Sequence, residues 1–272
     1  MRIRIVDAFT DRPFAGNPAG VVLLDTDAFP EDERLQRIAA EVNLSETAFA
    51  HPLPAGSPEA DWALRWFTPV TEVDMCGHAT LATAHVLHRT GRATGTVRFT
   101  ARCGVLGATA HPDGPITLDF PTSSLIPAAV PEELARALGV RPLSVHGTSE
   151  HLGDLLVELA DERTVRELAP DLRALARHSR RGIIATAGAE DPARGYDYVS
   201  RCFFPAYGID EDPVTGSAHT ALAPYWSARI GRPRLTGLQA SARTGLVRTE
   251  LRGDRTLLTG SAVTVIDGEL LV

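Results

Sequence analysis

The sequence predicts an α+β fold of two similar lobes, in each of which a curled, mostly antiparallel sheet surrounds a central helix. Residues 65–87 (RWFTPVTEVDMCGHATLATAHVL) match residues 201–226 (RCFFPAYGIDEDPVTGSAHTALAPYW) in order: aromatic residue, Pro, acid, Gly and small-residue helix. A second pair, 101–110 and 242–251, follows in the same order. Two copies are too few for a solenoid, so they indicate two related lobes.

The boundary between the lobes is expected near residues 120–131, a stretch rich in Pro and Ser. We assign residues 1–118 to the N-terminal lobe, with the C-terminal strand 264–272 as an optional addition. Residues 119–263 then form the C-terminal lobe.

Short apolar runs separated by turn residues predict strands in the first lobe. A helix is expected over residues 30–42, with Pro and acids in its first turn, and another after Gly77. The second helix has almost no charge through Val86, which predicts that it is buried. The predicted strands are IRIVDAF (3–9), GVVLL (20–24), TAFA (47–50), LRWF (64–67), TVRFT (96–100) and ITLDF (116–120).

In the second lobe, residues 131–139 and 171–180 are expected to be helical, the first ending at a Gly suited to a C-cap. A buried small-residue helix is expected to start after Gly216, as in the first lobe.

Composition limits the function. The net charge of −7 gives no basic footprint for nucleic acid, and no apolar run approaches the roughly 20 residues of a membrane span. The N-terminus enters a strand-like pattern with no signal-peptide core, and three scattered cysteines do not form a disulfide framework. We therefore expect a cytoplasmic protein with free thiols.

The absence of Lys excludes several enzyme classes. All 27 basic residues are Arg. A pyridoxal enzyme, a Walker A loop and a Lys-dependent aldolase each need a Lys. His85 and His88 are three residues apart, but no HExxH pattern or nearby acid supports a metal site. We expect neither a metal nor an organic cofactor.

The glycines before the two small-residue helices point to an anion site. The N-terminus of a buried helix offers unpaired N–H groups and partial positive charge, and Gly77 and Gly216 allow close approach of a ligand. If the lobes face each other, a small carboxylate is expected between the two helix ends. The alternative is two tight turns that only pack core helices.

Four motifs in order resemble the PhzF family of phenazine-biosynthesis-like isomerases, which have the diaminopimelate-epimerase fold. The resemblance implies an active site between the lobes, cofactor-free proton transfer on a small carboxylate in secondary metabolism, and a homodimer. The motifs are FAGNPAGVV (14–22), NLSETAFA (43–50), CGHATLA (76–82) and DEDPVTGSAH (210–219).

The resemblance assigns the acid/base role to Glu46, which without it would be taken for a solvated strand-end residue. A carboxylate suits proton transfer if burial raises its pKa. The resemblance also places His78, Asp212 and Ser217 in the site. His78 is expected to stay neutral at the positive helix end. Asp212 either orients His78, holds a substrate amine or hydroxyl, or caps a helix; Ser217 either caps its helix or binds carboxylate.

Asn17, Gly77 and Gly216 complete the expected substrate-binding set, although Asn17 is equally a turn residue; His219 is expected to be a packing residue. Cys76 stands where racemases of this fold have the first of two catalytic cysteines. The second loop has no thiol, and Cys202 precedes Gly216 by 14 residues, so a two-thiol racemase is disfavoured. The alternatives are an amino-acid epimerase that uses Glu46 or Cys76, and a binding protein that has kept the fold.

Overall fold

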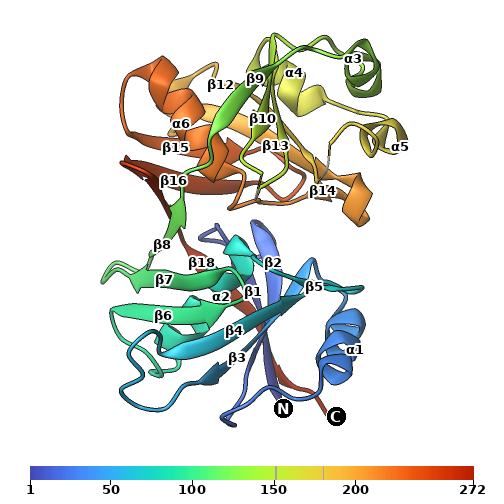
Figure 1. Cartoon of the computed structure of the whole chain (residues 1–272). Helices are drawn as coiled ribbons and strands as arrows, with labels where there is room; N and C mark the ends of the chain where they lie inside the picture. Colours follow the sequence, from blue (N-terminus) through green and yellow to red (C-terminus); the bar gives the residue numbers. More distant parts are fainter. Residues whose placement is uncertain (151, 180) are drawn as a thin grey trace. The chain divides into compact units, whose positions relative to one another are not determined.

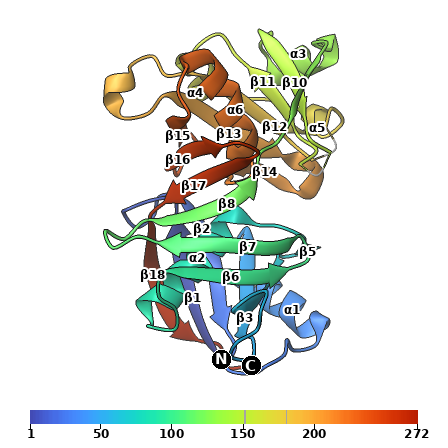
Figure 2. The same ribbon diagram turned by 60° about the vertical axis from the view of Figure 1, so that its left-hand side comes forward.

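A computed structural model of the chain describes residues 1–150, 152–179 and 181–272. Contacts within the chain define two compact units. Unit 1 comprises Met1–Asp119 and Thr259–Val272, and unit 2 comprises Phe120–Leu258. The chain leaves unit 1 within strand β8 (Ile116–Pro121) (Figure 1) and returns within strand β17 (Arg255–Gly260) (Figure 2).

Unit 1 is one curled sheet in which most neighbouring strands are antiparallel. Only the β2–β3 and β4–β6 pairs among those described are parallel. Met1 O accepts a hydrogen bond from Leu270 N (2.7 Å), so the two termini lie together. The strands, in order across the sheet, are β18 (Ala262–Glu269), β1 (Arg2–Ala8), β2 (Asn17–Leu23), β3 (Glu46–Pro52), β4 (Trp62–Phe67), β6 (Thr96–Ala101), β7 (Gly104–Ala110) and β8, with β5 (Glu72–Val73) beside β4.

Unit 2 repeats this sheet strand for strand. The β11–β12 and β13–β15 pairs are parallel and the other described pairs antiparallel, in the same order as in unit 1. The α+β fold of two similar lobes is therefore confirmed. The strands are β9 (Leu125–Ala128), β10 (Ser144–Thr148), β11 (Leu155–Glu158), β12 (Ile183–Gly188), β13 (Tyr198–Phe204), β15 (Arg234–Gln239) and β16 (Gly245–Arg252), with β14 (Ile209–Asp212) beside β13.

Each unit has one central helix against one face of its sheet. In unit 1, α2 (Gly77–Arg89) contacts β1, β2, β3, β7 and β18, and it is buried almost all round, as its lack of charge predicted (Figure 2). In unit 2, α6 (His219–Ile230) packs through Leu222 and Trp226 against Ile184 of β12 and Tyr198 of β13. The sheets position both helix N-termini, at which the candidate site residues lie.

Further helices cover the opposite face of each sheet. In unit 1, α1 (Asp32–Val42) packs Leu35 and Ile38 on the sheet. In unit 2, α3 (Glu132–Leu138), α4 (Glu162–Glu167) and α5 (Leu172–Leu175) share a core with Val157 and Ile183. Their strand neighbours Leu156 and Ile184 belong to the core around α6, as the alternation of strand side chains requires. Two short 3₁₀ turns, η1 (Pro192–Arg194) and η2 (Pro205–Tyr207), flank β13.

Helices α4 and α5 differ from the sequence-based expectation. Helices at 30–42 and 131–139 were predicted correctly, and Gly139 is the left-handed C-cap of α3. The helix expected over 171–180 has only four residues, because Leu175 is its single buried side chain; residue 180 lies outside the described part. Helix α4 was not predicted. Within the described residues, no helix has the length and apolar character needed to cross a membrane.

Candidate active site

Three elements of unit 1 bring predicted site residues together. Glu46 is the first residue of β3, and Asn17 is the first residue of the parallel neighbour β2. Cys76 is the N-cap of α2, whose first turn contains Gly77 and His78. Four of the residues predicted for the site, and Cys76, thus meet at the mouth of the central helix.

The imidazole of His78 lies between three polar groups. Its Nδ1 is 3.2 Å from Asn17 Nδ2 and 3.4 Å from Cys76 Sγ, and its Nε2 is 3.3 Å from Glu46 Oε2. With the amide oriented as in this structure, Asn17 Nδ2 donates, so Nδ1 accepts. The proton of the neutral ring is then on Nε2, the nitrogen nearest Glu46.

Burial keeps His78 neutral. It lowers the pKa of His78 to about 3, while the backbone carbonyl of Pro18 acts weakly in the opposite direction. The expected neutrality is therefore supported, but its main cause is desolvation. The contact between His78 and Glu46 is accordingly that of a neutral imidazole with a carboxyl group. The Glu46 side chain is 14% exposed, so it is shielded yet within reach of a small ligand.

Glu46, Cys76 and His78 are also a candidate ligand set for a metal, since one ligand atom of each lies within 4.8 Å of the others. However, Nδ1 of His78 faces Cys76 while Nε2 faces Glu46. One ion binds one imidazole nitrogen, so an ion held by all three residues would bind either Nδ1 or Nε2 of His78. The present rotamers form a row of thiol, imidazole and carboxyl group, in which His78 Nε2 and Glu46 Oε2 are in contact without a hydrogen bond. That the protein needs no metal stays a prediction.

Unit 2 contains the other predicted residues. Asp212 ends β14, and its Oδ2 accepts a hydrogen bond of 2.5 Å from Thr215 Oγ1. Gln239 Nε2 donates to the backbone oxygen of Asp212 (2.7 Å). Asp212 belongs to unit 2 and His78 to unit 1, and the orientation of one by the other stays a prediction.

The loop before α6 differs from the expectation. The helix was predicted to start directly after Gly216, but residues 216–218 form a tight turn and α6 begins at His219. In this turn, His219 N donates to Gly216 O (3.0 Å) and Thr220 N to Ser217 O (3.1 Å). These three-residue hydrogen bonds are those of a 3₁₀ turn, which commonly leads into an α-helix.

Sequence reasoning missed the cation that contacts Ser217. Arg181, two residues before the start of β12, donates from Nη2 to Ser217 Oγ (2.8 Å) and from Nη1 to Asp154 Oδ2 (3.0 Å). Asp154 is buried. Nothing in the local sequence distinguished Arg181, which follows another Arg at the end of the segment expected to be helical.

His219 is completely buried, and its Nδ1 lies 2.8 Å from Tyr198 Oη. Burial lowers the pKa of His219 to about 3. Its place in the core around α6 agrees with the expected packing role.

The two matching sheets can be aligned residue by residue. Thr47 of β3 pairs with Phe67 of β4, and Ile183 of β12 pairs with Phe203 of β13. Phe67 and Phe203 occupy the same place in the repeated sequences RWFTP and RCFFP. Thr47 and Ile183 are therefore counterparts, and the residues before them can be compared directly.

The counterpart of the Glu46 carboxylate is a glycine. Gly182 precedes Ile183 as Glu46 precedes Thr47, and a Cβ at Gly182 would come within 2.1 Å of the Phe204 ring. Unit 2 therefore has no side chain at this place, and the cation Arg181 stands one residue earlier.

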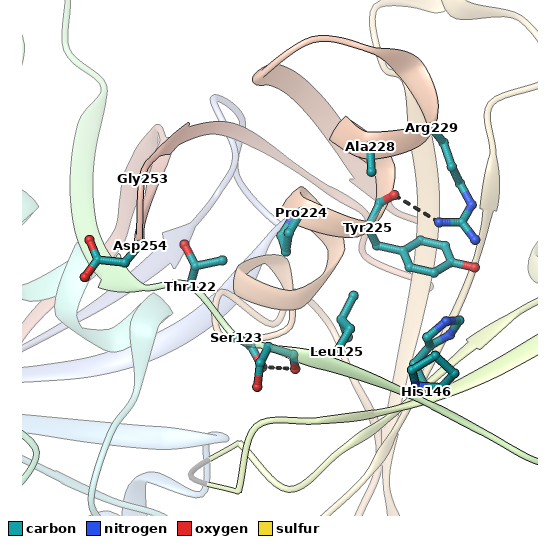
Figure 3. Close-up of a pocket in the computed structure, with 12 residues that line it drawn as sticks. Thr122, Ser123, Leu125, His146, Pro224, Tyr225, Ala228, Arg229, Gly253 and Asp254 are labelled. Atoms are coloured by element: carbon teal, nitrogen blue, oxygen red, sulfur yellow. Dashed lines mark hydrogen bonds between the residues drawn. The ribbon is translucent and has the colours of Figure 1, made fainter.

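A separate open hollow of about 510 Å³ lies in unit 2, between β9, β10 and α6 (Figure 3). None of the predicted site residues lines it. The guanidinium carbon of Arg229 sits 3.5 Å from the centre of the Tyr225 ring, and its Nε is 3.7 Å from Glu158 Oε1. The charge of Arg229 is thus already compensated.

Comparison with known proteins confirms the resemblance. The family model for phenazine biosynthesis-like proteins (PhzC-PhzF) matches residues 6–268, and the chain belongs to this family. It is 46% identical over 266 residues to an uncharacterized isomerase of Pseudomonas aeruginosa, covering 97% of this chain and 96% of that protein. An uncharacterized isomerase of Halalkalibacterium halodurans is 44% identical over 273 residues, with 99% and 98% covered.

A solved structure agrees. The crystal structure of a PhzF-family phenazine biosynthesis protein from Enterococcus faecalis superimposes with a TM-score of 0.90 at 39% identity, covering 100% of this chain and 99% of that one. The predicted class, an isomerase of the PhzF type, is confirmed by family and fold together.

Proposed function

We propose that this chain is a cofactor-independent isomerase that moves a proton within a small unsaturated or cyclic carboxylic acid in secondary metabolism. Glu46 is the general acid/base, with His78 and Asp212 as further catalytic groups. The observation that supports this most is the contact of the shielded Glu46 carboxyl group with His78 Nε2 at 3.3 Å. Asn17, Gly77, Gly216 and Ser217 are proposed to bind the acid.

Glu46 is proposed to take the proton from one carbon and return it to another on the same face of the substrate. Proton transfer is fastest for a group whose pKa lies near the working pH. His78, with its pKa near 3, is not protonated at neutral pH, so it does not supply the proton. Its Nε2–H forms no hydrogen bond to a described residue and is instead proposed to stabilise negative charge on a substrate oxygen.

The test is exchange of substrate hydrogen with deuterated water. Dihydroaromatic and pyrroline-type carboxylic acids are incubated with the enzyme and followed by ¹H NMR. We expect the wild-type protein to exchange at least one acid and Glu46→Gln to exchange none at a comparable rate. Glu41→Gln, an exposed carboxylate on α1, is the matched control and should behave as wild type. Full exchange by Glu46→Gln would sink the proposal.

A second candidate is an amino-acid epimerase in which Cys76 participates, because Cys76 Sγ lies 3.4 Å from His78 Nδ1. The position of the incorporated deuterium separates the two reactions. An isomerase places it on a carbon other than the one that lost the proton, whereas an epimerase places it on the α-carbon. Tight binding of an acid without any exchange would instead identify a binding protein.

We further propose that the protein is a homodimer that takes a small carboxylate as substrate, as the family resemblance implies, and that it is cytoplasmic, as its composition suggests. Light scattering of the purified protein should give about twice the chain mass of 29.1 kDa. A value near the chain mass at micromolar concentration would exclude a stable dimer.

A further inference from the structure

We infer that Arg181 is a positioning residue of the substrate site: anchored by Asp154, it fixes Ser217 as a hydroxyl donor to the substrate carboxylate. This rests on the proposed function, in which Ser217 binds that carboxylate. It adds to the site two residues that no motif of the sequence indicated.

Arg181 is held on three sides. Its Nη1 donates to Asp154 Oδ2 (3.0 Å), and its guanidinium carbon lies 4.9 Å from the centre of the Phe204 ring. Nη1 is also 3.3 Å from the backbone oxygen of Leu152. These contacts leave the planar guanidinium one orientation, in which Nη2 points at Ser217 Oγ (2.8 Å).

The hydrogen bond from Arg181 decides what Ser217 can do. A guanidinium has only donors, so Ser217 Oγ must accept this bond. The hydroxyl proton of Ser217 then remains for another acceptor. An anionic oxygen is the best such acceptor, because hydrogen bonds to ionised groups are the stronger ones. The nearby guanidinium charge favours an anion at the same place.

The burial of Asp154 is best explained by this orienting role. Its side chain is completely buried, whereas that of Arg181 is 29% exposed. No described residue offers a hydrogen bond to Asp154 Oδ1. A buried ion pair adds little stability, because desolvation offsets the attraction. It does hold a partner in one geometry, which an exposed pair does not.

The repeat supports the same interpretation. The start of β3 supplies Glu46 in unit 1, and the aligned start of β12 supplies Gly182 with Arg181 before it. In unit 2 the carboxylate stands instead on the neighbouring strand, as Asp154 next to β11. The aligned segments of the two sheets thus hold a carboxylate in unit 1 and, one residue earlier, a cation in unit 2.

The experiment measures binding of 4-fluorobenzoate and of its neutral analogue 4-fluorobenzamide by ¹⁹F NMR. Arg181→Gln should weaken benzoate binding about tenfold or more and leave the amide unchanged. Arg181→Lys should be nearly as weak, because a single ammonium group does not bridge Asp154 and Ser217. Arg201→Gln is the matched control, since Arg201 pairs with Glu211 and stacks on Phe203 in the same unit. It should bind both probes as wild type does.

A double-mutant cycle distinguishes positioning from general support of the fold. In a Ser217→Ala background, Arg181→Gln should weaken benzoate binding by less than about twofold, because its route of action is already removed. Thermal unfolding of every variant serves as the folding control, and Arg181→Lys with Ser217→Ala provide the test if Arg181→Gln does not fold.

The inference is overturned if Arg181→Gln binds benzoate as wild type does, or if Arg181→Lys has the full benzoate affinity of wild type. It is also overturned if the effects of Arg181→Gln and Ser217→Ala are additive, or if the wild-type protein binds neither probe. Arg181-dependent benzoate binding without any Glu46-dependent exchange would refute the proposed proton transfer and leave this inference standing. If Arg181→Gln changes neither the exchange rate nor the substrate affinity, this inference is refuted and the proposed proton transfer stands.

Discussion

The residues before α2 and those before α6 derive from one repeated pattern, yet they hold different chemistry. Aligned on their glycines, Cys76, Gly77 and His78 correspond to Thr215, Gly216 and Ser217. The first set lies beside a carboxyl group, and the second beside a guanidinium group. A duplicated fold therefore provides two equivalent places, of which one holds a carboxyl group and the other a guanidinium group.

Other parts of the repeat have stayed the same. Arg65 pairs with Glu72 and stacks on Phe67, and Arg201 pairs with Glu211 and stacks on Phe203 in the corresponding place. In unit 1 this ion pair links β4 to the short strand β5, and in unit 2 it links β13 to the short strand β14. Elements that both units share support the sheet, and elements that differ mark the site.

The largest expected difference between the units is in the effect of removing a carboxylate. Glu46→Gln should lower the exchange rate constant about 10²–10⁴-fold, the usual cost of losing a general acid/base. Asp154→Asn should change this rate constant at saturating acid less than about tenfold and act mainly on KM, because Asp154 is proposed to act through Arg181. The measurement is exchange by ¹H NMR over a range of concentrations of an acid that the wild-type enzyme exchanges.

Equal losses of rate constant in the two variants would break this comparison, since both carboxylates would then belong to the chemical step. If only Asp154→Asn lowers the exchange rate constant, the comparison is reversed and the chemical step belongs to unit 2.

Much of this arrangement follows from the sequence for identifiable reasons. The uncharged run after Gly77 correctly predicted helix α2, and the repeated order of motifs correctly predicted two equivalent sheets. Helix α4 was missed although Asp161 accepts a hydrogen bond from Thr164 N, an N-cap that the sequence contains. The helix over 171–180 was overextended because charged residues without an apolar stripe do not hold a helix on a sheet.

The site was only partly accessible from the sequence. Glu46, His78, Asp212 and Ser217 stood in motifs, whereas Arg181 did not. Its role depends on a strand register that places it beside a residue 36 positions later in the chain. Such a contact has no local signal, because it arises from the pairing of strands and not from the spacing of residues.

The next prediction concerns Asp154 alone. Burial raises the pKa of Asp154 from 3.8 to about 7, and the charge of Arg181 opposes this shift. Because the folded state binds the proton more tightly, the stability that Asp154 contributes is fully present below pH about 4 and is lost as pH rises through about 7. The free energy of unfolding of wild type minus that of Asp154→Asn should fall over this range, by at most about 4 kcal/mol.

Urea unfolding of both proteins between pH about 4 and 8 measures this difference. Burial lowers the pKa of His78 and of His219 to about 3, so their contribution to the free energy of unfolding decreases as pH falls below about 6.5. They do so equally in both proteins, and their effect cancels in the difference. A difference that is constant with pH, or that rises with it, would contradict the prediction.

A smaller effect is expected from restoring a side chain where unit 2 has lost one. Gly182→Ala would bring a Cβ within 2.1 Å of the Phe204 ring and 2.7 Å of the Phe203 backbone oxygen. Overpacking of this kind costs about 1–3 kcal/mol of unfolding free energy. Gly188→Ala at the other end of β12 is the control, because its Cβ would make only an ordinary contact of 3.5 Å with Trp226. Equal urea midpoints for the two variants would show that unit 2 still accepts a side chain at the place of Glu46.

The smallest effect is expected at the pair Cys76 and Thr215, which stand at the same place before the two glycines. A racemase of the two-thiol kind needs a thiol on each face of the substrate, and Thr215 offers a hydroxyl group that already donates to Asp212 Oδ2. A two-thiol mechanism therefore lacks its second thiol, and the contact of Cys76 with His78 Nδ1 can be reproduced by a serine hydroxyl. Cys76→Ser should therefore lower the exchange rate constant less than about tenfold, well short of the typical loss of an acid/base group.

Thr215→Ser, which keeps the hydroxyl group and removes one methyl group, is the matched control and should fall in the same range. Single-turnover kinetics with binding measured separately provides the comparison. If Cys76→Ser is inactive while Glu46→Gln still exchanges, the proton carrier is the thiol, and the site of unit 1 works as an epimerase.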